Sequence, residues 1–234
     1  MNDDPDRSEE VELESVAEER PLVPWEPWSA TDLRLQLFGQ EPHLPAALLS
    51  TDCILDVLGH GRAQPEREVG GILLGSFAET SRGAATRVQD MHIADSNDAS
   101  LTHVTFTHAA WEGIHAALDQ RDDDLAIVGW YHTHPGFGPF LSAHDRFIHE
   151  HFFAHPLQIA LVVDPLQGLL SLFGWSDGQV GRHSGCWIYA DQAQSQELER
   201  VSQDLSYVMD PVPPDEGFLR KLLNRLSRRY NVRG

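Results

Sequence analysis

The pattern of apolar and polar positions along the chain predicts alternating strands and helices. Short apolar runs bounded by glycine or polar residues are typical of buried strands, and apolar residues that recur every three or four positions are typical of helices. We expect strands at 33–38, 69–74, 86–93, 103–107, 125–131, 157–163 and 168–175. We expect helices at 45–58, 109–118, 143–153 and 190–207. A sheet covered by such helices forms an α/β sandwich.

The two ends of the chain depart from this pattern. Residues 1–24 contain nine acidic residues and two arginines, a composition that cannot bury enough apolar surface to fold. We therefore predict three regions: a disordered acidic segment at 1–28, a folded domain large enough for an enzyme at 29–190, and a helical segment at 191–234. Within the first segment, the proline- and tryptophan-containing stretch 21–28 can pack on the domain in extended form or bind a partner. In the last, leucines at helical spacing between basic residues predict an amphipathic helix at 218–230, packed on this domain, a second copy or a partner protein.

Composition narrows the function classes. The formal net charge of −19 argues against a nucleic-acid-binding protein. Because the sequence has no apolar run of about 18 residues, we expect no membrane span. Two cysteines do not form a disulfide framework and are typical of a reducing cytoplasm, so we expect a cytoplasmic protein. The short, compact form favours a prokaryotic source.

The stretch from Val128 to Asp145 contains the pattern H-x-H-x7-S-x2-D. His132 and His134 follow an apolar run, and residues two apart on a strand point to the same face. Two imidazoles and the carboxylate of Asp145 are a ligand set for a catalytic zinc, which keeps three protein ligands and a water. Ser142 lies beside them in sequence. In a chain with 13 histidines, the alternative interpretation is a coincidental strand end.

A metal hydrolase also needs a base that accepts a proton from water. The candidate is Glu68, which comes directly before the apolar, glycine-bearing run 69–75. The alternative is an exposed surface residue at the start of a strand, which is the more common location of a single glutamate.

Two motifs together carry a resemblance to a known family: Glu68-x-x-Gly71-x-x-x-Gly75 and His132-x-His134-Pro135-x6-Ser142-x2-Asp145. They resemble the JAMM (MPN-plus, JAB domain) zinc metalloproteases, and 128–145 is especially similar to the branch that includes the deubiquitinating subunit of the proteasome lid. The segments 60–63 and 161–167 add to the likeness, which covers about residues 44–175.

The resemblance implies an MPN fold, a mixed β-sheet flanked by helices in a cytidine-deaminase-like sandwich. It implies one Zn²⁺ per chain, bound by His132, His134 and Asp145. It also implies that Glu68 takes the proton of the water and returns it to the leaving amine, and that Ser142 donates a hydrogen bond to the oxyanion. The implied substrate is a ubiquitin-like protein or its conjugates, with E1-like and E2-like proteins of the same pathway as further partners. Substrate-binding residues remain unassigned.

Several alternatives stay open. The site can serve a zinc peptidase acting on a sulfur-carrier protein or a small peptide, or the chain can be a non-catalytic scaffold of the same fold. A zinc deaminase is rejected because the chain has no C-x-x-C motif. The polar loop 95–101 is either an ordinary surface loop or, as in relatives, part of a groove for the substrate tail. Additional histidines near the site are solvated residues or contacts to a second metal or the substrate: His144, His149, His151 and His155.

Overall fold

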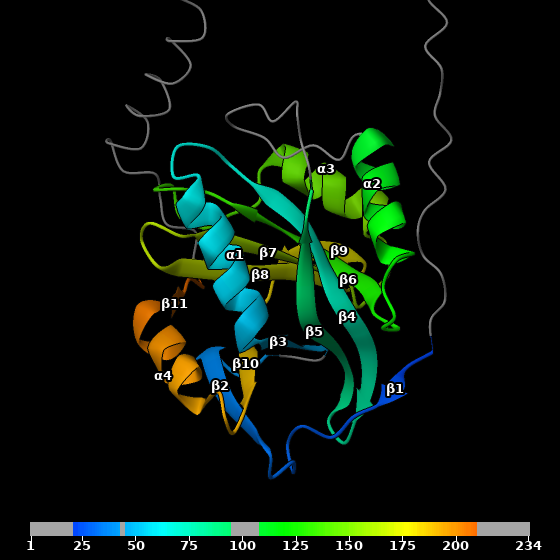
Figure 1. Cartoon of the computed structure of the whole chain (residues 1–234), viewed down its shortest axis with the longest axis vertical. Helices are drawn as coiled ribbons and strands as arrows, with labels where there is room; N and C mark the ends of the chain where they lie inside the picture. Colours follow the sequence, from blue (N-terminus) through cyan, green and yellow to red (C-terminus); the bar gives the residue numbers. More distant parts are fainter. Residues whose placement is uncertain (1–20, 43–44, 95–107, 210–234) are drawn as a thin grey trace, which may run out of the picture.

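The computed structural model describes residues 21–42, 45–94 and 108–209 (Figure 1). These residues form one mixed sheet of eleven strands with four helices, which confirms the predicted α/β class. The strands are β1 (Val23–Pro24), β2 (Leu33–Gly39), β3 (Ala46–Ser50), β4 (Gly70–Thr80), β5 (Gly83–Ile93), β6 (Ala126–Thr133), β7 (Ile159–Asp164), β8 (Leu169–Ser176), β9 (Gln179–Arg182), β10 (Gly185–Asp191) and β11 (Ser206–Tyr207). The helices are α1 (Thr51–Ala63), α2 (His108–Leu118), α3 (Ala143–Phe152) and α4 (Ser195–Asp204).

The order of the strands puts β6 near the middle of the sheet. The sequence across the sheet is β11-β8-β7-β6-β4-β5-β3-β10-β2, with β1 paired to β4 and β9 paired to β8. β6 runs antiparallel to β4 and parallel to β7. Because a central strand has neighbours on both sides, its end is a rigid place from which to present side chains.

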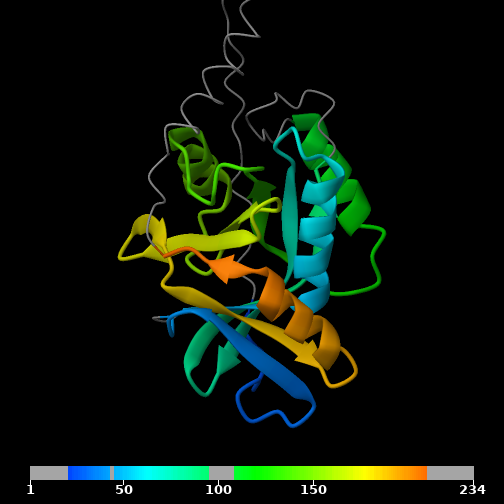
Figure 2. The same ribbon diagram turned by 90° about the vertical axis from the view of Figure 1, so that its left-hand side faces the viewer.

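Helices cover both faces of the sheet. α1 and α4 pack on one face, where they share a core cluster with alternate residues of β7 such as Leu161 and Val163 (Figure 2). α2 and α3 pack on the other face, where the cluster includes Ala160 and Val162. The alternation along β7 follows from the period of two in a strand. The helices predicted at 109–118 and 143–153 are confirmed.

The helix predicted at 45–58 is partly wrong. Residues 46–50 form β3, which is inserted in parallel between β5 and β10, and the helix starts only at Thr51. The hydroxyl of Ser50 accepts a hydrogen bond from the backbone N–H of Cys53, which is the N-cap arrangement that starts a helix. A short apolar run is compatible with a helix or a strand, and here pairing with a strand on each side stabilises the strand.

Other segments also differ from the prediction. The helix predicted at 190–207 is limited to α4, because 185–191 form β10 between β3 and β2. β9 and β10 were not predicted. The strand predicted at 103–107, the loop at 95–101, the acidic residues 1–20 and the helix at 218–230 lie outside the described residues.

Residues on both sides of the predicted domain 29–190 pack against it. Val23 and Pro24 pair with β4, and Trp25 lies edge-on against Tyr189 with 5.5 Å between ring centroids. At the other end, Leu198 and Val201 of α4 are buried in the same cluster as α1. The packed unit therefore begins before residue 29 and ends after residue 190.

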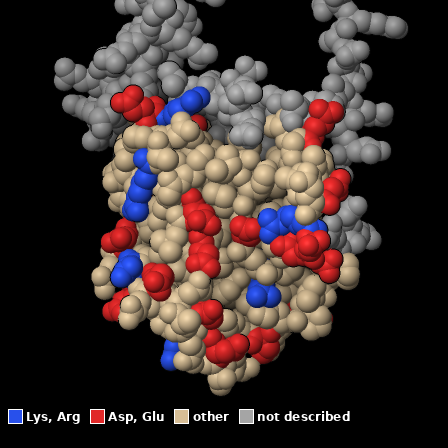
Figure 3. Space-filling view, in the orientation of Figure 1, with Lys and Arg blue, Asp and Glu red and all other residues tan. Residues whose placement is uncertain are grey.

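The surface agrees with the charge of the chain. On the face that carries α1 and β5, acidic side chains are interspersed with fewer basic ones, and this face shows no continuous basic patch (Figure 3). Within the described ranges, none of the helices has the length and apolar character needed to span a membrane.

Candidate metal centre

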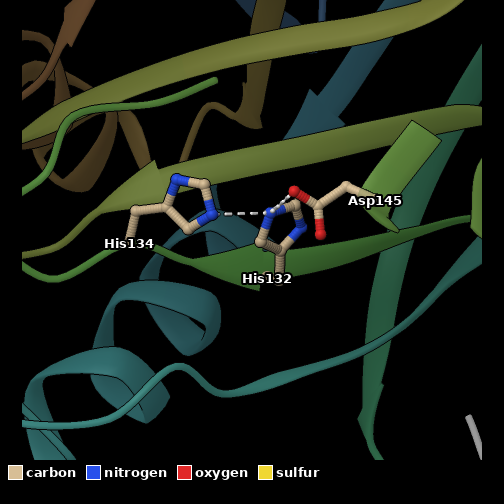
Figure 4. Close-up of side chains that lie close together, drawn as sticks. All are labelled: His132, His134 and Asp145. Atoms are coloured by element: carbon tan, nitrogen blue, oxygen red, sulfur yellow. Dashed lines mark hydrogen bonds and ion pairs between the residues drawn. The ribbon is translucent and has the colours of Figure 1, made fainter. Parts of the chain in front are cut away.

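The end of β6 brings the two histidines together. The backbone N–H of His134, one residue beyond the strand, still donates to the carbonyl oxygen of Val163 at 2.8 Å, so the extended path continues past Thr133. The side chain of His132 lies on the same face as that of Trp130, and this is the face that α3 covers. α3 carries Asp145, whose carboxylate meets the two imidazole rings (Figure 4).

His132, His134 and Asp145 form a compact buried cluster. One ligand atom from each lies within 4.8 Å of the others, and the three residues are 0%, 3% and 4% exposed. The Nε2 atoms of the two histidines are 3.0 Å apart, and Nε2 of His132 is 3.5 Å from Oδ2 of Asp145. Two imidazoles and one carboxylate that converge in this way fit a divalent metal ion, and they are the donor types that zinc prefers. Among the described residues, this is the one group of three or more such side chains close enough to share an ion.

The surroundings of His134 keep it in the form that a metal requires. Burial, and next the neighbouring His132, lower the pKa of His134 to about 3. The ring is therefore neutral at pH 7. Its Nδ1 lies 3.2 Å from the carbonyl oxygen of Gly138, which can only accept, so Nδ1 carries the hydrogen and donates it. Nε2 therefore carries no hydrogen, and its lone pair faces the cluster, 3.0 Å from Nε2 of His132, an arrangement typical of metal-binding histidines.

Asp145 is held as a carboxylate by the start of α3. Its Oδ2 accepts from the backbone N–H of Ser142 at 2.7 Å, and the Ser142 hydroxyl oxygen accepts from the backbone N–H of Asp145 at 3.1 Å. This reciprocal pair is a capping box. Burial opposes ionisation of Asp145, but His132 and the hydrogen bonds from His132 and Ser142 outweigh it and hold the pKa well below the usual range. The motif Ser-x-x-Asp thus both positions a candidate ligand and starts the helix.

Aromatic side chains fix the histidine rings. Trp130 stacks on His132 with centroids 4.7 Å apart and planes 15° apart, and Phe140 lies 4.3 Å from the ring of His134. The indole N–H of Trp130 donates to Nδ1 of His149 at 3.1 Å. The sequence pattern alone assigned no role to these aromatic residues. The position of Trp130 could have been predicted, because a residue two positions before His132 on a strand shares its face.

The additional histidines take separate positions. His149 is fully buried, and burial, followed by the charges of His183 and Arg146, lowers its pKa to about 4. His151 is exposed and stacks on Phe147, and His155 stacks on Phe77 at 4.3 Å. His149 is therefore a core residue that orients Trp130. None of these histidines, nor His144, belongs to a second cluster of ligands in the described part of the chain.

The pairing of β4 with β6 places Glu68 at the same end of the sheet. The backbone N–H of Val69 donates to the Thr133 hydroxyl at 3.1 Å, and the N–H of Thr133 donates to the carbonyl oxygen of Val69 at 2.9 Å. Continued by one residue, the antiparallel register brings Glu68 level with His134. Glu68 and Ser142 are both half-buried, which distinguishes Glu68 from a fully exposed glutamate at a strand start.

The chain is similar to known proteins. Residues 44–155 match the protein family described as JAB1/Mov34/MPN/PAD-1 ubiquitin protease. The chain is 30% identical over 132 residues to the ubiquitin carboxyl-terminal hydrolase RPN11 of Saccharomyces cerevisiae, a match that covers 56% of this chain and 42% of that protein. It is 32% identical over 185 residues to the 26S proteasome non-ATPase regulatory subunit 14 of Dictyostelium discoideum, covering 78% of this chain and 54% of the relative. The chain thus spans about half the length of these relatives.

Proposed function

We propose, from the match of residues 44–155 to the JAB1/Mov34/MPN/PAD-1 family and the similarity to RPN11, that the chain is a zinc-dependent isopeptidase or peptidase. Its substrate would be a ubiquitin-like protein, cleaved after the C-terminal glycine either in a conjugate or in a precursor. The observation that carries this proposal is the buried cluster of His132, His134 and Asp145, with Glu68 and Ser142 half-buried at the same end of the sheet.

The ligand cluster would hold a single zinc ion. His134 is neutral and directs a lone pair into the cluster, and Asp145 is ionised, so neither residue has to release a proton at neutral pH before it binds. When bound, zinc is a Lewis acid toward the scissile carbonyl and lowers the pKa of water toward about 7. The chain itself supplies the ligands, the aromatic walls that orient them and the groups that move protons.

Glu68 is proposed as the general base and acid. A carboxylate at the rim of the site can accept a proton from the attacking water and return it to the amine that leaves. This assignment needs a side chain that is neither fully buried nor free in solvent, and Glu68 is half-buried.

Ser142 is proposed to stabilise the oxyanion. Its oxygen accepts from the backbone N–H of Asp145, and a hydroxyl that accepts one hydrogen bond still has its own hydrogen to donate. A fixed donor directed at developing negative charge stabilises the transition state by about 3 kcal/mol.

A terminal glycine suits a site whose ligands are buried. A residue without Cβ lets the substrate backbone approach closely, and the leaving group would be a lysine amine or a peptide nitrogen. The name of the yeast relative, a ubiquitin carboxyl-terminal hydrolase, supports the same substrate class. Proteins that activate or transfer the modifier, of the E1-like and E2-like types, would be partners in the same pathway.

The proposal is tested with linear fusions of ubiquitin-like proteins to a reporter. We expect cleavage directly after the final glycine, loss of cleavage with a zinc chelator and recovery on addition of Zn²⁺. A glycine-to-valine change in the substrate should strongly reduce the rate, whereas a change in the following residue should have less effect. The double variant His132→Ala, His134→Ala is the matched control, and it should lose both bound zinc and activity.

Two outcomes would contradict the proposal. Hydrolysis of short unrelated peptides without cleavage of any ubiquitin-like fusion would instead favour a general zinc peptidase. Stoichiometric zinc without hydrolysis of any substrate would favour a non-catalytic scaffold.

A further inference from the structure

A buried carboxylate outside the ligand cluster holds the turn that follows His134. Asp164 is fully buried and is the last residue of β7. Since Val163 pairs with Thr133 of the parallel strand β6, Asp164 lies next to the point where the chain leaves β6 for His134. Its two oxygens accept hydrogen bonds from five N–H groups: Oδ1 from the backbone of Gly136 (3.0 Å), Leu166 (3.0 Å) and Gln167 (3.1 Å), and Oδ2 from the backbone of Gly138 (2.9 Å) and the side chain of Gln167 (2.6 Å).

The turn is built so that two of its amides face this carboxylate. Gly136 and Gly138 have φ angles of +79° and +71°, in the left-handed region that favours glycine. The N–H of Phe137 donates to the carbonyl oxygen of His134 at 3.1 Å and closes the turn. Asp164 thus occupies the inside of the turn and replaces the water that these amides would otherwise bind.

Gly138 connects this carboxylate to the metal ligand. Its N–H donates to Asp164, and its carbonyl oxygen accepts the hydrogen bond from Nδ1 of His134. We propose that Asp164 is a positioning residue for the metal centre, which holds Gly138 in place and thereby fixes the orientation and tautomer of the His134 ring. The effect reaches the metal through one intervening residue, without contact between Asp164 and the ion.

The chemistry of the side chain explains why a carboxylate is needed. An ionised carboxylate only accepts hydrogen bonds and has about four lone-pair sites on two oxygens. Asparagine has the same shape but a single acceptor oxygen. If that oxygen faces the three donors at Oδ1, the NH₂ group faces the N–H of Gly138, and two donors then oppose each other. The variant Asp164→Asn therefore releases Gly138, the residue that orients His134.

The inference rests on the proposed zinc site and is tested by zinc affinity. Affinity is measured by competition with a chromophoric chelator in the 234-residue chain, and the melting temperature of the metal-free protein is recorded beside it. We expect Asp164→Asn to bind zinc about 10- to 100-fold more weakly, the range typical of residues that orient a metal ligand.

Thr86→Val is the matched control. The hydroxyl of Thr86 is buried and donates to the carbonyl oxygen of Leu157, two residues before the start of β7, which is the end of the strand far from Asp164. The isosteric change removes a buried hydrogen bond and lowers stability without affecting Gly138. Its zinc affinity should stay within twofold of the wild type. Affinity within twofold for a folded Asp164→Asn variant would overturn the inference.

Hydrogen exchange provides a measurement that needs no variant. In the metal-free wild type, the amides of Gly136 and Gly138 should exchange far more slowly than in an unstructured peptide, because both are bonded to a buried carboxylate. Rapid exchange of both would overturn the inference even if Asp164→Asn does not fold. A wild type that binds no zinc would instead refute the proposed function, while the exchange data would still decide whether Asp164 holds the turn.

Discussion

Ser142 is predicted to have two separable roles, and the variant Ser142→Ala tests both. Its hydroxyl oxygen caps α3 by accepting from the backbone N–H of Asp145 at 3.1 Å. Loss of a serine N-cap costs about 1 kcal/mol of the free energy of unfolding. For a domain of this size, that cost corresponds to a fall of about 2–4 °C in melting temperature. Zinc content should persist, because the backbone N–H of Ser142 still donates to the carboxylate of Asp145.

The effect on catalysis should be far larger than the effect on stability. Removal of a single oxyanion donor typically lowers kcat by about 100- to 1,000-fold. A loss of about 1 kcal/mol leaves nearly all molecules folded, because native domains have roughly 5–15 kcal/mol in reserve. Unfolding therefore cannot account for the predicted loss, which has to come from the missing hydroxyl. The assay is steady-state cleavage of a ubiquitin-like fusion at saturating zinc, with thermal unfolding measured on the same samples.

Two further variants separate the roles. Glycine is nearly as good an N-cap as serine, so Ser142→Gly should keep the melting temperature and lose the same activity. Ser50→Ala is the converse control, because Ser50 caps α1 through the N–H of Cys53 at 3.2 Å and donates to the carbonyl oxygen of Gln89 at 2.9 Å. It should lower the melting temperature and leave kcat unchanged. If Ser142→Ala stays within threefold of the wild-type kcat, Ser142 is a helix cap without a catalytic role.

Glu68, His149 and the N-terminal segment provide three other tests. Glu68→Gln should fold and keep its zinc but lose at least about 100-fold in turnover, because an amide cannot accept the proton of water; turnover within threefold of the wild type would remove Glu68 from the mechanism. In the unfolded chain His149 has a pKa of about 6.5, whereas in the native protein burial lowers its pKa to about 4. Between these values the unfolded chain binds a proton that the native protein does not. The free energy of unfolding of the metal-free protein should therefore fall by about 2 kcal/mol from pH 7 to pH 5. Denaturant titrations should show a shallower pH dependence for His149→Gln, and an unchanged slope would contradict this assignment. Removal of residues 1–20 should leave melting temperature and zinc content unchanged. Removal of residues 1–28 should lower the melting temperature, because it also removes the ring contacts of Trp25 with Tyr189 and of Trp28 with Trp187.

Local sequence was sufficient to predict the cluster of candidate ligands. His132 and His134 are two positions apart at the end of an apolar run, and an extended backbone places such side chains on one face. The spacing of Ser142 and Asp145 is that of a capping box, so the same four residues specify both a helix start and the position of a carboxylate. These features depend on contacts between residues close in the chain, and short-range backbone geometry decides them.

Pairing between distant strands decided the rest. The run 46–50 has no local feature that separates strand from helix, and it became a strand because β5 and β10 provide hydrogen-bonding partners on both sides. Glu68 lies level with His134, a residue more than sixty positions later, because β4 pairs with β6. The partners of β6 are Gly129 for Leu73 and Ile127 for Leu74, so Val128 is an extra residue in the ladder. A bulge of this kind reverses the alternation of faces, and residues 130 and 132 consequently point toward α3 and Asp145.

The support beneath the ligands was determined by tertiary structure alone. Asp164 appears in the sequence as one carboxylate among 36 acidic residues, and only the parallel pairing of β6 with β7 brings it to the turn after His134. His149 likewise gained its role from the packing of α3 on the sheet, which placed its ring against the indole N–H of Trp130. Sequence patterns specify which donor atoms a short segment presents. Strand order and helix packing decide which buried groups become the hydrogen-bond partners of these donors. The partners meet only when distant parts of the chain pack together and exclude water.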